Sequence, residues 1–379
     1  MTEVLIKAYK YRIYPNCEQK VLIAKHFGCA RFTYNWALAL QQKHYEKHKK
    51  SLSRKEIQDQ LVALKKQDEF SWLAEVNSQT LLSSLLHVYT AFGNFFKGRA
   101  KFPRFKSKKI PQCSYQCPQY GTVDFENSVI HLPKIKGIKA KFSRSFEGKL
   151  KTVTLIKTAT GKYYASILVE TEVQAIMPTT IDPNQTVGID LGLNDILIMS
   201  DGTKVKNPHH FRNAQTRLVV QQKIFARKKK ESKNYQQQKL SVARIHEKVR
   251  QQRLDLHHKL THQLICENQA TSYAVEDLGI KNMLRNRKLA KSIADVAWFQ
   301  FLTLLRYKAK WHGKNVLEIG RYMPSSKACS CCGYTHPKLP LSIRSWQCPE
   351  CESIWDRDVN ASLNIRKFAL ADALGPSAV

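Results

Sequence analysis

The sequence predicts a mixed fold in two parts, an α+β part followed by an α/β part. In the first half, segments of β composition stand on both sides of a long helical stretch. In the second half, apolar strands alternate with helical segments, as in a sheet covered by helices. Two C-x2-C motifs near the C-terminus indicate a zinc ribbon inserted in this second part. We therefore expect an N-terminal β-barrel with a helical insertion, and then an α/β domain that carries the ribbon.

The chain is expected to open with a strand and to continue as helices. Residues 4–13 (VLIKAYKYRI) are rich in β-branched and aromatic side chains, and Pro15 ends this segment. From about 16 to 97, apolar residues recur at helical spacing. Asn77 or Ser78 is suited to cap the third helix of this stretch.

Strand composition returns at 112–175, where the last two strands form a hairpin that turns at Thr160-Gly161. We expect these strands to complete one barrel with the strand at 4–13. Between the helices and these strands lies the loop 97–109 (KGRAKFPRFKSKK), in which aromatic residues separate the basic ones. This composition suits contacts with phosphates and bases. It also suits a solvated loop whose Phe102 and Phe105 pack into the core.

The second part begins after a proline-containing linker at 176–184. The elements expected there, in order, are two strands within 186–205, a helical hairpin at 208–265 with its break near 231–234, a strand at 270–280, a helix at 293–312, a strand at 315–320, the ribbon, and a last helix at 360–374. The hairpin is strongly basic, with 14 Lys/Arg and 3 Asp/Glu between Arg212 and Lys259. It fits both a solvated structural hairpin and a contact with a nucleic-acid backbone.

The charge balance indicates a polyanionic partner. The chain has 379 residues, with 62 Lys and Arg against 30 Asp and Glu, a formal charge of +32. Such a charge disfavours the compact state unless a polyanion offsets it. Nucleic acid is the first candidate and an anionic membrane the second. We expect no membrane association, because no apolar run approaches the length of a spanning helix. The N-terminus also lacks the apolar region of a signal peptide.

The cysteines predict one structural metal. Cys329, Cys332, Cys348 and Cys351 follow the pattern C-x2-C, fifteen residues, C-x2-C. Four thiolates close a tetrahedral Zn²⁺ site without an open position, so we expect the zinc to be structural. Cys331 makes the first pair ambiguous, and we prefer Cys329 with Cys332 because that spacing matches the second pair. The other cysteines are scattered, which fits a reducing cytosol rather than a disulfide framework. They are Cys17, Cys29, Cys113, Cys117 and Cys266.

Three carboxylates stand at the ends of expected elements in the second part. Asp190 ends or lies within a strand (VGIDLG), Glu276 ends a later strand (AVEDL), and Asp358 stands where the last helix begins (DRDVNAS). Singly, each has a structural explanation: Asp190 could stabilise a turn, Asp277 is as good a candidate as Glu276, and Asp358 could be the N-cap of its helix. Together they match the way in which a ribonuclease-H-like nuclease supplies its metal ligands.

Such acids would hold two divalent ions about 4 Å apart, one to activate water and one to stabilise the leaving oxygen. Mg²⁺ suits this ligand set, and Mn²⁺ is the alternative. The histidine pairs 209–210 and 257–258 lack metal-ligand spacing, and we expect them on helix surfaces. No GxxxxGK[ST] motif is present, so nothing indicates an NTP-driven enzyme.

These residues resemble the TnpB (OrfB) family, RNA-guided nucleases of insertion sequences that are related to type V CRISPR effectors. The resemblance covers nearly the whole chain. In the first half it rests on KAYKYRIYPNCEQK, FGCARFTYNWAL, AFGNFFK and FPRFKSKK, and in the second half on GIDLG, VEDLGIKNM, PSSKACSCCG, RSWQCPEC and DRDVNAS.

The resemblance implies a wedge β-barrel at 1–15 and 110–178, a helical recognition insertion at 16–109, and a RuvC-like nuclease domain at 185–379 with the zinc ribbon at 325–355. It places the catalytic acids on Asp190, Glu276 and Asp358. It implies a guide RNA transcribed from the transposon end and a double-stranded DNA target next to a short transposon-associated motif. It also implies a prokaryotic cytosol, near the nucleoid.

The chain departs from the family pattern at two positions. Trp355 stands where the family usually has His, and Glu352 stands where Gly is common. The second change affects a turn in which Gly would allow a positive φ.

Two other functions use the same features. A strand-transfer transposase uses similar metal chemistry, but its usual acid order is Asp, Asp, Glu, whereas this chain has Asp, Glu, Asp. A regulator that binds nucleic acid, with or without a guide RNA, and does not cut is the other alternative. The intact set of three acids argues against it.

Overall fold

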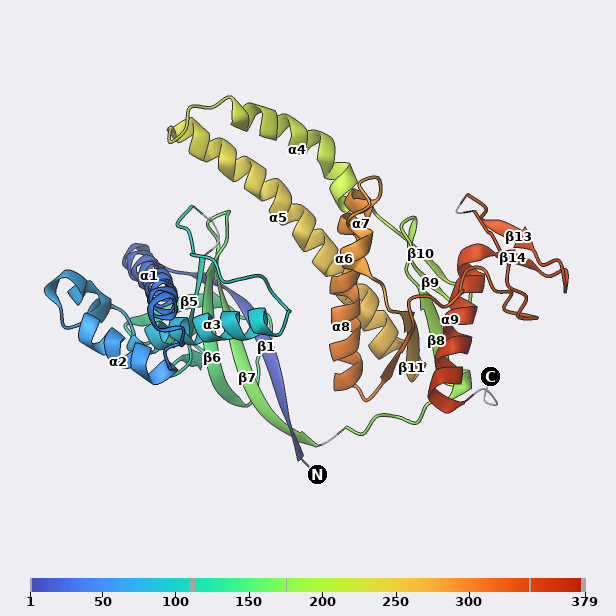
Figure 1. The fold of residues 1–379 in the computed structure, drawn as a ribbon, viewed down its shortest axis with the longest axis horizontal. Helices are drawn as coiled ribbons and strands as arrows, with labels where there is room; N and C mark the ends of the chain where they lie inside the picture. Colours follow the sequence, from blue (N-terminus) through green and yellow to red (C-terminus); the bar gives the residue numbers. More distant parts are fainter. Residues whose placement is uncertain (1, 110–112, 175, 341, 376–379) are drawn as a thin grey trace. The chain divides into compact units, whose positions relative to one another are not determined.

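The computed structural model describes residues 2–109, 113–174, 176–340 and 342–375. The expected domain limits at 1, 110 and 379 lie outside these residues. The chain divides into two compact units, Met1–Ala175 and Ile176–Val379, which are coloured blue to green and green to red in Figure 1. The fold is of mixed α and β type, as the sequence predicts.

The sheet of the first unit has seven strands in the order β2-β6-β7-β1-β5-β4-β3. The first strand, β1 (Thr2–Tyr14), pairs antiparallel with β7 (Tyr163–Gln174) along most of its length, and its last residues pair with β5 (Ile135–Lys141). The strand expected at 4–13 is therefore confirmed and lies inside a sheet built mainly from later residues. The remaining strands are β2 (Cys113–Cys117), β3 (Thr122–Asp124), β4 (Val129–Leu132) and β6 (Lys149–Lys157).

The expected turn of the hairpin is also confirmed. Between β6 and β7, Gly161 takes φ +79° and donates its backbone N–H to the carbonyl of Thr158 at 3.0 Å. Glycine adopts this conformation at little cost.

Three α-helices separate β1 from the rest of its sheet: α1 (Cys17–His48), α2 (Arg54–Leu64) and α3 (Ser78–Phe96). Each begins at a side-chain cap, provided by Asn16, Ser53 and Asn77 respectively. Such caps satisfy backbone N–H groups that the helix itself leaves without acceptors. The cap expected at residue 77 or 78 is therefore Asn77. The helices pack on one another around a buried group that includes Leu38, Ile57, Leu81 and Leu85.

The sheet of the second unit has five strands in the order β10-β9-β8-β11-β12. Its centre is parallel: β8 (Thr186–Asp190), β11 (Ser272–Glu276) and β12 (Asn315–Ile319) run in one direction. The antiparallel β9 (Asp195–Met199) and β10 (Lys204–Lys206) complete one edge.

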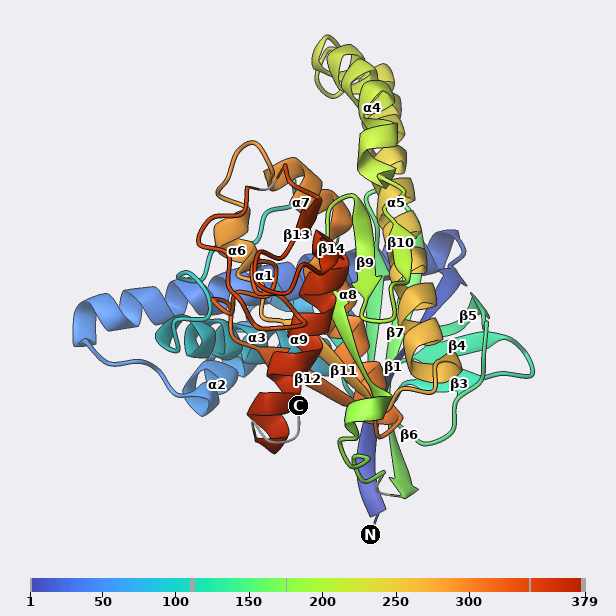
Figure 2. The same ribbon diagram turned by 90° about the vertical axis from the view of Figure 1, so that its right-hand side faces the viewer.

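Helices cover both faces of this sheet. On one face, Tyr273 and Val275 of β11 are buried together with residues of α5 (Lys233–His262) and α8 (Trp298–Trp311). On the other face, Ala274 is buried with residues of α9 (Arg357–Leu374). Figures 1 and 2 show α9 lying along the sheet. Because side chains alternate along a strand, consecutive residues of β11 serve the two faces.

The basic segment forms the expected hairpin of α4 (His210–Ala226) and α5, with a break at 227–232. Figures 1 and 2 show its tip projecting away from the sheet. The helix expected at 293–312 is instead two helices, α7 (Ala290–Val296) and α8. They are separated by Ala297 in a left-handed conformation, φ +56°. Trp298 and Phe301, which follow Ala297, are both buried. The free energy gained by burying their rings offsets the cost of the left-handed conformation at Ala297. A four-residue helix, α6 (Ile280–Met283), precedes them.

One histidine prediction is wrong. His257 is fully buried and its ring packs at 6.0 Å, centroid to centroid, against Phe301. Its partner in sequence, His258, is exposed, because neighbouring residues of a helix point to different sides. Within the described residues, no helix is long and apolar enough to cross a membrane.

Candidate metal centres

The parallel pairing of β8 with β11 brings two of the predicted acids to the same end of the sheet. Ile189 lies opposite Val275 in this pairing. The next residues, Asp190 and Glu276, are the last residues of their strands. The carboxyl ends of adjacent parallel strands are the usual place for binding sites in α/β sheets.

The third acid reaches this end of the sheet through α9. This helix packs so closely on β8 that a Cβ atom at Gly188 would collide with the carbonyl oxygen of Ser362. Glycine is therefore required at that strand position for α9 to approach. Asp358 is the second residue of α9, one turn before Ser362. The N-cap of α9 is Asp356, whose carboxylate accepts the N–H groups of residues 358 and 359, so the capping explanation of Asp358 is wrong.

The charges of the other two acids act on Asp190. Burial, together with the charges of Asp358 and Glu276, raises the pKa of Asp190 to about 7. Burial and the charge of Asp277 raise the pKa of Glu276. Carboxylates arranged in this way favour a bound cation, which would offset the repulsion. The donor set therefore fits a divalent ion that prefers oxygen ligands. Among the residues that the structure describes, the three acids do not form a close group of ligand atoms, whereas the four cysteines do.

The acids beside the predicted ones have other partners. Asp277 accepts from Nε of Arg321 at 2.8 Å. Asp356 caps α9 and pairs with Lys204 Nζ at 2.7 Å. These contacts favour Glu276 and Asp358 as the members of the cluster.

The four predicted cysteines form one cluster, with Sγ atoms within 4.8 Å of one another. Cys329 Sγ lies 3.6 Å from Cys351 Sγ, and Cys332 Sγ lies 3.5 Å from Cys348 Sγ. Four thiolates at about 2.3 Å from one zinc ion would lie roughly 3.8 Å apart, so the cluster fits that ion. Cys331 is exposed and is not part of the cluster.

Both departures from the family pattern have a structural role here. Trp355 donates its indole N–H to Cys329 Sγ at 3.2 Å. Glu352 takes φ +57°, the conformation that Gly would adopt more easily, and its backbone N–H donates to the carbonyl of Cys348. The expected positive φ at this turn is confirmed.

The segment 325–355, which carries the four cysteines and is called the cysteine module below, is joined to α9 by two buried asparagines. Asn360 donates to the carbonyl of Ala328 at 2.7 Å and accepts the N–H of Ser330 at 2.9 Å. Asn364, one turn later, donates to the carbonyls of Ser325 and Ala328. The same turn of helix carries Asp358, so the fold of the module and the position of this acid are linked.

Two arginines lie near the acids and were not predicted from the sequence as part of this site. Arg344, in the cysteine module, places Nη1 at 3.5 Å from Asp358 Oδ1. Arg357 is buried and donates to the carbonyl of Pro340 at 2.6 Å. Its positive charge offsets a small part of the rise in the pKa of Asp190. Arg357 lies within the acidic DRD motif, a signal that could have identified it. Arg344 has no such signal, because only folding of the module brings it near an acid.

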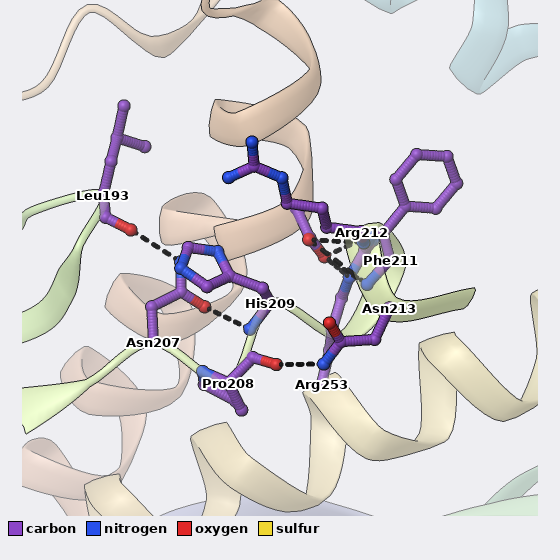
Figure 3. A network of polar contacts seen from close by, with 9 residues as sticks. Leu193, Asn207, Pro208, His209, Phe211, Arg212, Asn213 and Arg253 are labelled. Carbon is purple, nitrogen blue, oxygen red and sulfur yellow. Dashed lines mark hydrogen bonds and ion pairs between the residues drawn. The ribbon is translucent and has the colours of Figure 1, made fainter. Parts of the chain in front are cut away.

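The base of the basic hairpin is fixed by a polar network (Figure 3). The buried carboxylate of Asp295 accepts the N–H groups of Phe211 and Arg212, in the first turn of α4. It also pairs with Arg253 of α5 at 3.0 Å. Before α4, Asn207 donates to the carbonyl of Leu193 at 2.7 Å. These contacts fix both helices of the hairpin to the rest of the second unit.

The loop 97–109 keeps its aromatic residues accessible. Phe102 is 45% exposed and Phe105 is 55% exposed, so the interpretation that packs both in the core is wrong.

Known protein families match separate parts of this chain. Three family descriptions match: "Probable transposase" at residues 166–287, "Cas12f1-like, TNB domain" at 298–365, and "Helix-turn-helix domain" at 1–50. In the structure, residues 2–48 contain one strand and one long helix.

Curated relatives match over almost the whole chain. A Streptomyces pristinaespiralis protein, "Putative RNA-guided DNA endonuclease", is 37% identical over 98% of this chain and 91% of its own length. An Escherichia coli protein, "Putative RNA-guided DNA endonuclease InsQ", is 33% identical over 95% of this chain and 91% of its own. The chain belongs to the TnpB (OrfB) family.

A solved structure shares the fold. It is described as a Cas12f1-sgRNA-target DNA complex, with a TM-score of 0.57, 13% identity, and coverage of 96% of this chain and 99% of that one.

Proposed function

We propose that this chain is an RNA-guided DNA endonuclease that cuts target DNA next to a short transposon-associated motif. The observation that carries this proposal is the gathering of Asp190, Glu276 and Asp358 at one end of a parallel sheet, in a chain of the TnpB family. The names of the curated relatives support the same activity.

We assign 1–15 and 110–178 to a wedge β-barrel, 16–109 to a recognition insertion, 185–379 to a RuvC-like domain of the ribonuclease H type, and 325–355 to a zinc ribbon. The pairing of β1 with later strands supports the first assignment, although β2 and β3 remain at the edges, so the barrel would be open. The two-stranded sheet of β13 (Ser345–Gln347) and β14 (Ile354–Asp356) supports the last.

The three acids would hold Mg²⁺ or Mn²⁺. Bound there, such ions activate water and stabilise the leaving oxygen of a phosphodiester. The protein would bring the carboxylates together and hold Asp190 in a buried position beside Glu276 and Asp358. There the ionised form of Asp190 is unfavourable unless a cation is bound. Arg344 lies beside Asp358 with its side chain 58% exposed, so it is placed to pair with a phosphate group.

Zinc at Cys329, Cys332, Cys348 and Cys351 would be structural. Metal analysis should find about one zinc per chain, as one closed four-thiolate site requires. Cys348→Ser should lower zinc content and cleavage together, because the module is bonded to the turn of α9 that carries Asp358. Fully active protein without zinc would contradict this assignment.

The proposed partners are a guide RNA from the transposon end and a double-stranded DNA target. Base pairing by the guide would supply sequence recognition, so the protein needs mainly backbone contacts. The charge of +32 and the anchored basic hairpin support such contacts. The proposed location is the prokaryotic cytosol, near the nucleoid.

The deciding experiment is cleavage of a plasmid that matches the copurifying RNA, with Mg²⁺, by wild type and by single Ala variants of Asp190, Glu276 and Asp358. Each variant should lose cleavage and keep RNA binding. The neighbouring Asp277→Asn is the control and should still cut. RNA-free protein should not cut, and cutting at the same sequence without RNA would instead indicate a self-sufficient nuclease.

A further inference from the structure

A cavity of about 660 Å³ lies in the first unit, and none of the acids or clustered cysteines discussed above belongs to its lining. It is bounded by the C-terminal half of α1, the end of α3 and the loop that follows α3. Its volume is within the range of about 300–1,000 Å³ that small-molecule sites show. Its aromatic lining residues are Tyr45, Tyr89, Phe92, Phe95, Phe96 and Phe102.

Aromatic faces are accessible at this cavity. Phe96 is 77% exposed, Tyr45 is 54% exposed and Phe102 is 45% exposed. The ring of Phe102 stands edge-on to Phe92 and Phe95, with centroids 5.6 and 5.3 Å apart. Exposed rings of this kind are suited to stacking on a planar ligand.

Two of the lining side chains, Gln41 and Tyr89, are held in place by hydrogen bonds within the protein. The side chain of Gln41 donates to the carbonyl of Leu52 at 2.8 Å and accepts its N–H at 3.0 Å. The hydroxyl of Tyr89 donates to the same carbonyl at 3.2 Å. A site that is already ordered loses little entropy when it binds.

The charges around the cavity indicate what kind of ligand would enter. The loop between Phe96 and Phe102 carries Lys97, Arg99 and Lys101, all exposed and without an acid between them. Among the described residues that line the cavity, by contrast, the one charged side chain is that of Glu46, which is exposed and negative. A phosphate is therefore favoured on the loop and disfavoured in the cavity, where a neutral ring with hydrogen-bonding edges fits better.

We propose that this cavity holds one unpaired base of the guide RNA, stacked on Phe96 and Phe102, while the loop 97–101 contacts the adjoining phosphates. This inference rests on the proposed function. A folded RNA offers unpaired bases, which proteins stack on aromatic side chains, before any target is bound. Target DNA exposes an unpaired strand only after the guide has paired with it. We therefore assign the ligand as an RNA nucleotide, and DNA binding by the loaded variants tests the other source.

Gly93 allows a matched test. It belongs to the lining, and a Cβ atom added there meets no atom within 4 Å. Gly93→Ala should therefore leave the cavity open, while Gly93→Leu should fill part of it. Both changes favour the helix over glycine, so they differ mainly in the space that they occupy.

The probe is the RNA that copurifies with the wild-type protein, sequenced and transcribed, and its affinity is measured at several salt concentrations. Gly93→Leu and Phe96→Ala should weaken binding by roughly five- to a hundred-fold, the loss expected for one stacked base. Gly93→Ala, and Phe299→Ala at an exposed ring of the second unit, should bind as wild type. The salt dependence should be unchanged in the Phe96 variant and smaller in an Arg99→Ala/Lys101→Ala variant, which removes phosphate contacts.

Equal RNA affinity of the Gly93→Leu, Gly93→Ala and Phe96→Ala variants would overturn this inference. So would a Phe96→Ala variant that binds RNA normally but, once loaded with RNA, binds the matched DNA duplex more weakly, because the base would then come from DNA. In both cases wild-type RNA binding and cleavage would still support the proposed function. A wild-type protein that binds no RNA would instead refute the proposed function itself.

Discussion

At the scale of single residues, Asp190 shows how a candidate catalytic group reduces stability. It ends a strand in an apolar sheet, and the neighbouring Glu276 and Asp358 add negative charge. Its pKa of about 7 lies above the ordinary 3.8, so the folded protein binds a proton that the unfolded chain releases between these pH values. The contribution of the neutral form to stability is fully present below the ordinary pKa and is lost as pH rises through about 7.

We therefore expect the melting temperature of the metal-free protein to fall as pH rises from about 4 to about 7 and to level off above that, and Asp190→Asn to reduce this fall. Mg²⁺ should raise the melting temperature of wild type at the higher pH and have less effect on the variant. The exposed Asp255→Asn is the control and should behave as wild type in both respects. Equal pH profiles for wild type and Asp190→Asn would contradict the raised pKa.

Glu352 is a second residue whose conformation has a measurable cost. Its φ of +57° disfavours any side chain with a Cβ, by about 1 kcal/mol or more. Glu352→Gly should raise the free energy of unfolding by less than that, because glycine also gains freedom in the unfolded chain. Chemical denaturation with zinc present would measure the change. The exposed Glu350→Gly, where φ is not positive, should give no gain, and an equal gain there would argue against relief of strain.

At the scale of elements, the anchoring of the basic hairpin depends on one buried carboxylate. Asp295 of α7 accepts from the first turn of α4 and pairs with Arg253 of α5. Removing one partner of a buried ion pair leaves the other charge without compensation.

Asp295→Ala should therefore destabilise the second unit by about 3 kcal/mol, at the lower end of the usual range because Arg253 keeps some solvent contact. Asp255→Ala removes an exposed pair with Lys259 on the same helix and should cost roughly 0.5 kcal/mol or less. Hydrogen exchange of the α4 amides should increase only in the first variant. Similar effects of both changes would mean that the Asp295 network does not fix the hairpin.

At the scale of the whole molecule, charge links stability to the partner. A net charge of +32 repels itself in the free protein, and a bound polyanion removes that repulsion. Binding to the folded state alone also raises stability by mass action.

The copurifying RNA should therefore raise the melting temperature of the protein, and the increase should shrink as salt concentration rises. Thermal unfolding with and without RNA at several salt concentrations would measure this. Binding of the RNA with no shift in melting temperature at low salt would contradict the expected coupling.

The sequence alone determined the order of most elements and the family, and it identified the four cysteines and three acids as candidates, since these depend on local periodicity, motif spacing and residue identity. Only the tertiary structure placed Asp190, Glu276 and Asp358 at one end of the sheet, because strand pairing and the close approach of α9 at Gly188 join distant segments. It also decided that Asp356 caps α9 and that Ala297 breaks a helix which periodicity continues. The burial of His257, the contact of Arg344 with Asp358 and the aromatic cavity likewise depend on packing between elements, which no local pattern encodes.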